Sequence, residues 1–347
     1  MKKRLLSALV LLGLVLSVGS VVSCGRAGEL YSVESFESFD TVTTVMGYAD
    51  SRETFDGVAE EILQMLAEYH RLFDIYHTYE GMENLCTLNR GAAASPVRVD
   101  GRVMELLLYG KEMYALTEGQ VNIAMGSVLS LWHDCRERAE TDPEGAALPD
   151  GKALADAGGH TDIEDLLLDE EKGTVFFSDP LLKLDIGAIA KGYAVERVAQ
   201  AMEAKGITGY VINAGGNVRV IGPKADGSPW TVGVDHPESK ESYLARLSLS
   251  EESLVTSGSY QRYYTVDGER YHHIIDPDTG MPAEGFSSVS VVCPDSALAD
   301  ALSTALFCMS LEEGRDLIES IPDAEAMWLC EDGTIVVSLG FEKYSLP

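Results

Sequence analysis

The sequence predicts an α+β fold in which helices pack against antiparallel sheets. Strand-like segments occur mainly as hairpins, the clearest with Asp267-Gly268 between two alternating stretches, and helix-like segments come in pairs between them. The motifs GxGxxG, GxxxxGK[ST], GxSxG and HExxH are absent, so dinucleotide-binding, P-loop, α/β-hydrolase and zincin folds lack support. The order of the segments therefore favours antiparallel sheets over a doubly wound parallel sheet.

Hydrophobic periodicity gives the expected position of each element. Alternating or short apolar runs predict strands over residues 39–48, 181–184, 210–213, 230–235, 245–249, 261–266, 270–275, 287–292, 326–330 and 334–339. Apolar residues at helical spacing predict helices over residues 55–69, 103–117, 188–205 and 297–310. Residues 79–90 are expected to form a loop. The polar stretch 139–159, which contains Gly and Pro, is expected to be an exposed excursion with one short helix.

The segment 181–221 organises the expected site. Its first apolar run ends at Asp185, and Gly187 turns the chain into a helix. The strand after that helix leads into Gly215 and Gly216, whose missing side chains allow the backbone to approach a ligand closely.

Lys191 lies in the first turn of this helix, where the helix dipole disfavours a cation. One interpretation is an anion bound between the helix amides and the lysine ammonium. The other is an ordinary lysine whose stem lies along the surface. Lys191 by itself leaves both interpretations open.

The composition excludes some classes of function. The formal charge is -30 at pH 7, and nucleic-acid binding is excluded because it requires a basic surface. A phosphate held locally by a lysine, amides and a metal is compatible with this charge. The six cysteines form no CxxC pair and have no histidine at zinc-finger spacing, so a disulfide framework is not expected. Five are expected to be small buried hydrophobes, and Cys24 differs.

The N-terminus has a basic start, an apolar run and small residues before Cys24. Val21-Val22-Ser23-Cys24 resembles a lipobox, which implies cleavage before Cys24 and lipidation of its thiol, with palmitate as an expected acyl group. A plain secretory signal or a membrane-spanning helix is the alternative. The expected organisation is a signal peptide at 1–23, a tether at 24–35 and one domain at 36–347. This domain would lie outside the cytoplasm, held on the cell membrane by a lipid anchor.

Asp300 and Thr304 are four residues apart on the last long expected helix and project from one face. A carboxylate and a hydroxyl suit Mg²⁺, which takes few protein ligands and completes its shell with phosphate and water oxygens. Alternatively, Thr304 bonds the carbonyl of Asp300 within the helix and Asp300 is a solvated acid. The apolar neighbours favour a ligand role, because an acid among them requires a partner.

Three other positions have both a functional and an ordinary interpretation. His273 precedes a dense turn and is either a general base or a polar residue at a sheet edge. Ser257 belongs to a small polar loop, 256–260, that is able to hydrogen-bond an extended ligand. Tyr76 either stacks on a ligand ring or packs internally.

Five motifs in register resemble the ApbE-type FAD:protein FMN transferases. They are LDIGAIAKGYA at 184–194, INAGGNVRVIG at 212–222, TSGSYQRYY at 256–264, HIIDPDTG at 273–280 and ADALSTALF at 299–307. The resemblance spans residues 36–339 and implies a T-fold-like α+β architecture. It also implies a Mg²⁺-dependent enzyme that transfers the FMN half of FAD to a threonine of an acceptor redox protein, through a phosphoester bond, and releases AMP.

The resemblance also implies roles for individual residues. The Mg²⁺ ligands would be the main-chain oxygen of Ala188 and the side chains of Asp300 and Thr304. His273 and Lys191 are the expected catalytic residues, with His273 as the base. The expected contacts to the flavin nucleotide are Tyr76, Asn122, Asp185, Lys191, Gly215, Gly216, Ser257 and Ile274.

The chain departs from the family at two positions, Asn122 and Asn217, where members commonly have an acid. Both changes bear on FAD contacts and on the number of metal ions. Two other functions fit the same residues. One is an FAD pyrophosphatase that releases FMN and AMP, and the other is a lipid-anchored flavin-binding protein without chemistry. The expected partners are FAD, an acceptor protein and, through the lipid, the membrane.

Overall fold

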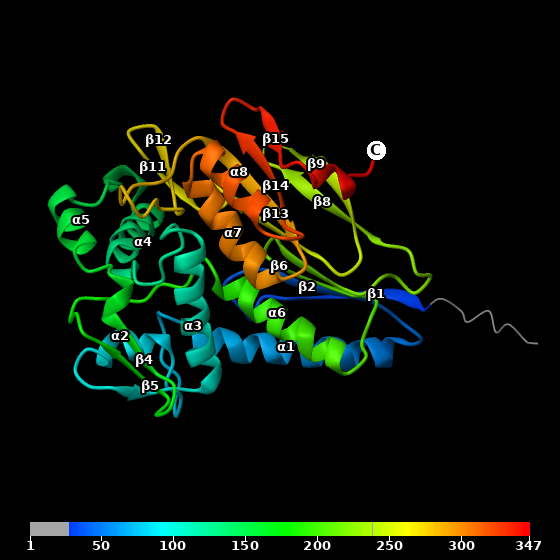
Figure 1. Ribbon diagram of the computed structural model, residues 1–347, viewed down its shortest axis with the longest axis horizontal. Coiled ribbons are helices and arrows are strands. Elements are labelled where there is room, and N and C mark those ends of the chain that lie inside the picture. The colour runs from blue at the N-terminus through cyan, green and yellow to red at the C-terminus, as the bar shows by residue number, and fades with distance from the viewer. Residues whose placement is uncertain (1–27, 238) are drawn as a thin grey trace, which may run out of the picture.

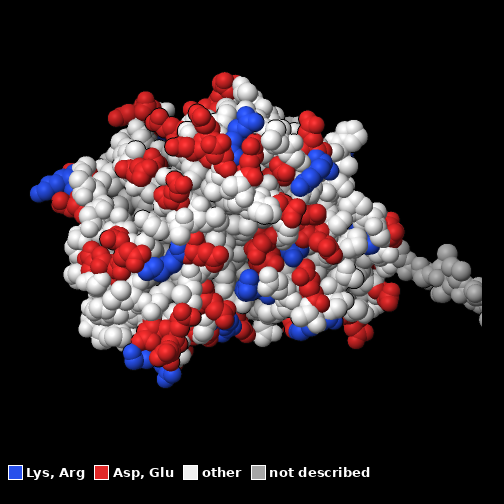
Figure 2. Space-filling model, in the orientation of Figure 1, with Lys and Arg blue, Asp and Glu red and all other residues white. Residues whose placement is uncertain are grey.

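The computed structural model describes residues 28–237 and 239–347. The predicted signal peptide and Cys24 lie outside the described residues. Within them, no helix has both the length and the apolar character needed to cross a membrane. Acidic side chains are scattered over the face shown in Figure 2, with lysines and arginines between them, so this face carries no extended basic surface.

An eight-stranded sheet with strand order β1-β2-β6-β7-β10-β13-β14-β15 forms the centre of the molecule (Figure 1). All neighbouring strands in it are antiparallel, which confirms the predicted α+β class. The strands are β1 (Glu29–Ser35), β2 (Thr43–Ala49), β6 (Tyr210–Ala214), β7 (Asn217–Ile221), β10 (Ser253–Gly258), β13 (Phe286–Cys293), β14 (Glu325–Cys330) and β15 (Ile335–Val337).

Smaller sheets and helices surround this sheet. The small strands are β3 (Val97–Arg98), β4 (Leu166–Asp169), β5 (Thr174–Phe177), β8 (Trp230–His236), β9 (Ser239–Leu249), β11 (Tyr263–Val266) and β12 (Glu269–His272). The helices are α1 (Arg52–Phe73), α2 (Leu85–Gly91), α3 (Gly101–Leu116), α4 (Gly126–Thr141), α5 (Gly151–Gly158), α6 (Ala190–Ala204), α7 (Ser296–Cys308) and α8 (Leu311–Ser320). In Figure 1, α6 lies between α1 and α7, and α4 and α5 lie at one end of the molecule.

Both faces of the large sheet are buried, because successive side chains of a strand point to opposite faces. Ile212 and Val291 pack with residues of the helices, whereas their neighbours Val211 and Val292 pack with residues of β8 and β9. The strands are therefore apolar on both sides, which explains their short continuous apolar runs.

The hairpin predicted at Asp267-Gly268 is confirmed, and the glycine pair singled out from the sequence also forms a tight turn. Asp267 and Gly268, with φ of 52° and 89°, join β11 to β12. Gly215 and Gly216, with φ of 58° and 90°, join β6 to β7. Both connections are two-residue hairpins with positive φ at both positions, which glycine adopts without steric cost.

The predicted strand at 181–184 is wrong. Among the described residues, this stretch makes only an isolated bridge between Lys183 and Met125. The backbone N–H of Leu184 donates to Asn89 Oδ1 at 2.7 Å, and its carbonyl accepts from Asn89 Nδ2 at 2.9 Å. One asparagine side chain thus satisfies both backbone groups, and no neighbouring strand is required.

Four other expectations need correction. The loop expected over residues 79–90 contains most of α2, whose capping box pairs Asn84 with Thr87. Residues 29–35 of the expected tether form β1, an edge strand whose largely exposed side chains leave little apolar pattern. The strand expected from residue 39 begins at Thr43, because Phe39 and Asp40 are left-handed, with φ of 56° and 49°. Residues 256–258 of the expected polar loop belong to β10.

Candidate functional site

A cavity of about 600 Å³ opens where α4 and the N-terminal end of α6 meet α7, the turn between β6 and β7, and the end of β10. All twelve of the described residues predicted for the site line it. They are Tyr76, Asn122, Asp185, Ala188, Lys191, Gly215, Gly216, Ser257, His273, Ile274, Asp300 and Thr304. Cys24, predicted to be lipidated, lies outside the described residues.

The turn before α6 is built by Asp185. Its Oδ1 accepts a hydrogen bond from the N–H of Gly187 at 2.9 Å, and burial raises the pKa of its carboxyl group. The N-cap residue of α6, Ile189, provides no side-chain cap. The first N–H of α6, that of Ala190, donates locally to the Ile186 carbonyl at 2.9 Å, so the N–H groups after it need partners from elsewhere in the fold.

Asp300 of α7 supplies one of those partners. Its Oδ2 accepts a hydrogen bond from the N–H of Gly192 at 2.8 Å, so a carboxylate from another helix caps α6. A Cβ at position 192 would overlap Ser296 O and Asp300 Cβ, which explains why glycine is present. This close approach of α6 and α7 places the carboxylate at the wall of the cavity.

Lys191 also faces Asp300, with 3.9 Å between its Nζ and Asp300 Oδ1. The Asp300 side chain is 5% exposed, and burial raises its pKa while Lys191 and the Gly192 amide act to lower it. At this distance Lys191 does not form a hydrogen bond with Oδ1, so Oδ1 remains able to bind a cation. Because Lys191 lines the cavity, its ammonium is positioned to contact an anion there.

Thr304 lies one turn after Asp300, and its Oγ1 is 3.4 Å from the hydroxyl of Ser257 in β10. The hydrogen bond back to the Asp300 carbonyl, considered for Thr304 from the sequence, is made at 3.0 Å by Ser303. Ser257 and Ser303 also share a hydrogen bond of 2.8 Å. The Thr304 hydroxyl therefore remains available to a ligand in the cavity.

The donors expected for Mg²⁺ fit that ion chemically. Ala188, Asp300 and Thr304 line the same cavity and offer a carbonyl, a carboxylate and a hydroxyl oxygen. In the described part of the chain, no three His, Cys, Asp or Glu side chains gather around a common point. A site with one carboxylate suits a hard cation that retains water and takes phosphate oxygens.

His273 follows β12 and is held by the backbone of Arg262. Its Nδ1 lies 3.2 Å from the Arg262 carbonyl, and since a carbonyl only accepts, Nδ1 carries the proton and Nε2 has the free lone pair. Burial, with Arg262 and Arg136 adding repulsion, lowers the pKa of His273 to about 3. The imidazole is therefore neutral at pH 7. The adjacent His272 instead donates from Nε2 to the Ala283 carbonyl at 2.8 Å.

Tyr76 stacks on His133, with ring centroids 4.9 Å apart. Tyr76 is 47% exposed, and partial desolvation at the cavity wall and the nearby Asp185 carboxylate raise its pKa. The Asn122 amide is engaged internally, accepting from Ala124 N and donating to Thr161 O, both at 2.9 Å. Asn122 thus shapes the cavity wall mainly through its fold contacts.

Several residues that line the cavity were not singled out from the sequence, among them four close to Tyr76. These four are His133, Arg136, Gln261 and Arg262. His133 and Arg136 are three residues apart on α4, and Arg136 Nη2 lies 2.9 Å from His133 Nδ1. Their spacing of three residues, which places both side chains on one face of a helix, is a signal that the sequence does contain.

Known proteins are similar to this chain in both sequence and fold. The family model described as "ApbE family" matches residues 39–328. An FAD:protein FMN transferase of Klebsiella pneumoniae is 29% identical over 82% of this chain and 85% of that protein. One of Treponema pallidum is 33% identical over 74% of this chain and 73% of that protein.

Solved structures agree with these matches. The ApbE protein of Thermotoga maritima superposes with a TM-score of 0.80 at 30% identity, covering 92% of this chain and all 100% of that one. The flavin transferase ApbE of Vibrio cholerae gives a TM-score of 0.75 at 25% identity, covering 91% and 99%. Fold, cavity and relatives together define an enzyme of the flavin transferase class. The chain belongs to the ApbE family, which confirms the resemblance drawn from its motifs.

Proposed function

We propose that this enzyme transfers the FMN half of FAD to a threonine hydroxyl of an acceptor redox protein and releases AMP, in a Mg²⁺-dependent reaction. The observation that carries the proposal is the meeting of Lys191, Asp300, Thr304 and His273 at one cavity, although they come from distant segments. Relatives named FAD:protein FMN transferase support the flavin substrate and the protein acceptor.

Binding of the diphosphate is assigned to the start of α6. The Lys191 ammonium and the positive end of the α6 dipole present positive charge to an anion in the cavity. Ala188 O, the Asp300 carboxylate and the Thr304 hydroxyl would hold Mg²⁺. When bound, Mg²⁺ supplies charge neutralisation at the attacked phosphorus and at the leaving phosphate.

Proton transfer is assigned to His273. The acceptor hydroxyl gives its proton to Nε2 of the neutral imidazole as its oxygen bonds to the FMN phosphorus. The bond between that phosphorus and the oxygen bridging the two phosphates breaks, and AMP leaves with the bonding electron pair. Tyr76, at the cavity wall, offers a face for stacking on the flavin ring or the adenine.

A direct experiment separates this function from its alternatives. The protein is incubated with FAD, Mg²⁺ and a threonine-bearing acceptor domain, and the acceptor is then analysed by mass spectrometry. Transfer adds one FMN to the acceptor and forms AMP. FMN and AMP free in solution, with an unmodified acceptor, would identify an FAD pyrophosphatase. Bound flavin without AMP would identify a flavin carrier and overturn the proposal.

The cellular location is a second part of the proposal. The sequence before Cys24 supports a lipoprotein signal, so the mature enzyme would act outside the cytoplasm on a lipid anchor. Cys24→Ala should abolish incorporation of labelled palmitate and shift the protein from the membrane fraction. Equal labelling of this variant would show that the anchor is not attached at Cys24.

A further inference from the structure

Asn217, the first residue of β7, lies directly behind Asp300. It is 0% exposed and, unlike Asp300, does not line the cavity. Its Oδ1 accepts a hydrogen bond from the Ser296 hydroxyl at 2.6 Å, which fixes the orientation of the amide. The opposite end of the amide, Nδ2, therefore points away from Ser296.

Among the described residues, Nδ2 of Asn217 has no hydrogen-bond partner. It lies beside the Asp300 carboxylate and acts to lower the pKa of that group. It is also 3.0 Å from the position that a Cβ at Gly192 would occupy. A buried amide donor without a partner is costly, so its place next to a buried carboxylate requires an explanation.

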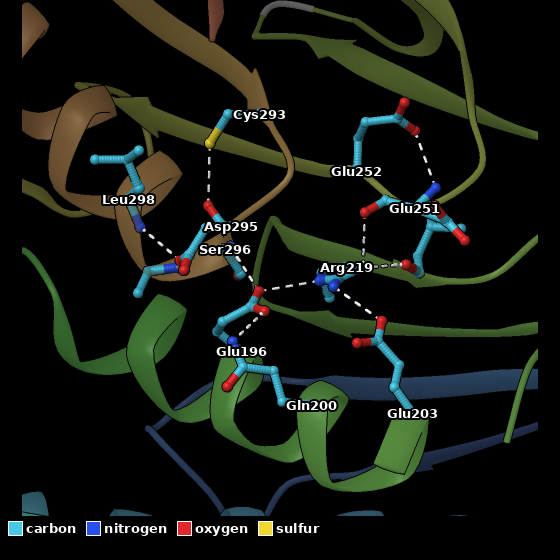
Figure 3. A network of polar contacts seen from close by, with 12 residues as sticks. Glu196, Gln200, Glu203, Arg219, Glu251, Glu252, Cys293, Asp295, Ser296 and Leu298 are labelled. Carbon is cyan, nitrogen blue, oxygen red and sulfur yellow. Dashed lines mark hydrogen bonds and ion pairs between the residues drawn. The ribbon is translucent and has the colours of Figure 1, made fainter. Parts of the chain in front are cut away.

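Ser296, which orients this amide, is itself held from a second direction. Its backbone N–H donates to Glu196 Oε2 at 2.8 Å, and Glu196 is fixed by Arg219 Nε at 3.0 Å (Figure 3). Arg219 is in turn bound by Glu203 and by the Glu251 carbonyl, both at 2.9 Å (Figure 3). The serine is thus anchored to α6 and β7, and its hydroxyl has a fixed position.

We infer that Asn217 is a positioning residue that presents Asp300 to the divalent cation. The Asn217 amide would donate to the carboxylate together with the Gly192 N–H, so two neutral donors would fix the plane of the group that holds the cation. Ser296 keeps the donor end of the amide toward Asp300. This inference rests on the metal site of the proposed function. It adds a residue that contacts the metal ligand Asp300 and not the metal itself.

The choice of amide has a chemical consequence. An amide supplies a donor without charge, so it orients the carboxylate without adding a positive charge that would repel the cation. Partners behind a metal ligand orient it, and their loss typically weakens metal binding by about 10- to 100-fold. A purely structural Asn217 would join β7 to α7 and would not affect metal affinity at all once the protein is folded.

The test measures binding of Mn²⁺ alone, by electron paramagnetic resonance of the free ion, to the protein without FAD. Asn217→Leu keeps the size of the side chain and removes the donor, and we expect its Mn²⁺ affinity to fall about 10- to 100-fold. Ser296→Ala leaves the amide but frees its orientation, and we expect a loss of about fivefold, the effect of one neutral hydrogen bond.

Glu203→Gln is the matched control, because it cuts the same network at its partly exposed end, where Glu203 binds Arg219. We expect its Mn²⁺ affinity to equal that of the unmodified protein, even where its thermal stability falls. Circular dichroism without metal checks that each variant is folded. If Asn217→Leu does not fold, Mn²⁺ binding is measured with Asn217→Ala, for which we expect the same fall in affinity.

Two results would overturn the inference, and they are distinguishable. If the unmodified protein binds Mn²⁺ and the folded Asn217 variant binds it equally well, Asn217 has no positioning role and the metal site stands. If the unmodified protein binds no Mn²⁺, the proposed metal site fails and this inference fails with it.

Discussion

The N–H of Gly192 donates to Asp300 Oδ2 at 2.8 Å across 108 positions of sequence, so the carboxylate expected to bind Mg²⁺ is also a cap of α6. The two helices that carry Lys191 and Asp300 are therefore joined at the site itself. Because one carboxylate oxygen is held by the amide, the other has a defined direction toward the cavity. This hydrogen bond couples the packing of α6 against α7 to the position of the candidate metal ligand.

Gly192→Ala should destabilise the protein. The added Cβ overlaps a backbone oxygen, Ser296 O, which is unable to rotate away, so α6 and α7 must separate. We expect a loss of about 1–3 kcal/mol in the free energy of unfolding, measured with urea. Gly57→Ala is the control, since Gly57 lies in α1 and a Cβ added there would have nothing within 4 Å, and it should gain up to about 1 kcal/mol. Equal effects of both variants would contradict the close-contact explanation.

Asp300→Asn should separate metal binding from folding. Its amide oxygen still accepts from Gly192, but the charge that attracts Mg²⁺ is removed. We expect the rate of Mg²⁺-dependent transfer to fall by more than about 100-fold. Loss of a residue that only orients a metal ligand typically costs about 10- to 100-fold, and Asp300 is the ligand itself in this proposal. Since burial raises the pKa of this carboxyl group, the metal-free variant should be at least as stable as the unmodified protein. Full activity of Asp300→Asn would remove the proposed ion site.

His273→Gln should slow the transfer step while FAD binding persists. Glutamine retains a donor for the Arg262 carbonyl but has no basic nitrogen. We expect a rate loss of about 10²- to 10⁴-fold, the usual contribution of a general base. Single-turnover transfer to the acceptor measures the rate, and flavin fluorescence measures FAD binding. An unchanged rate would show that another group accepts the proton.

The same histidine predicts a pH dependence of stability. Its pKa is lowered from 6.5 to about 3 in the folded protein, chiefly by burial, so the unfolded chain binds the extra proton between these values. This group therefore reduces stability as the pH falls below 6.5, and it has no effect above that pH. At pH 5 the cost is at most about 2 kcal/mol. Urea unfolding at pH 7.5 and pH 5 should show a smaller decrease for His273→Gln than for the unmodified protein. Parallel decreases would show that His273 is readily protonated in the folded state.

The sequence by itself determined the elements whose causes are local. The Asp267-Gly268 hairpin, the glycine pair before β7 and the spacing of Asp300 and Thr304 depend on neighbours within a few residues, and each is present in the structure. The antiparallel α+β class follows from such hairpins. The resemblance also identified twelve of the residues that line the cavity, ten of them within the five motifs.

Only the tertiary structure decided how distant groups satisfy one another. Leu184 takes its backbone partners from Asn89, 95 positions away, so an apolar run that resembles a strand is not one. Asp300 caps α6, Ser296 orients Asn217, and residues 29–35 gain order by pairing with β2. The physical reason is that a buried donor or acceptor needs a hydrogen-bond partner, and the fold often supplies it from a distant part of the chain. The spacing of residues in the sequence does not show which distant residue this partner is.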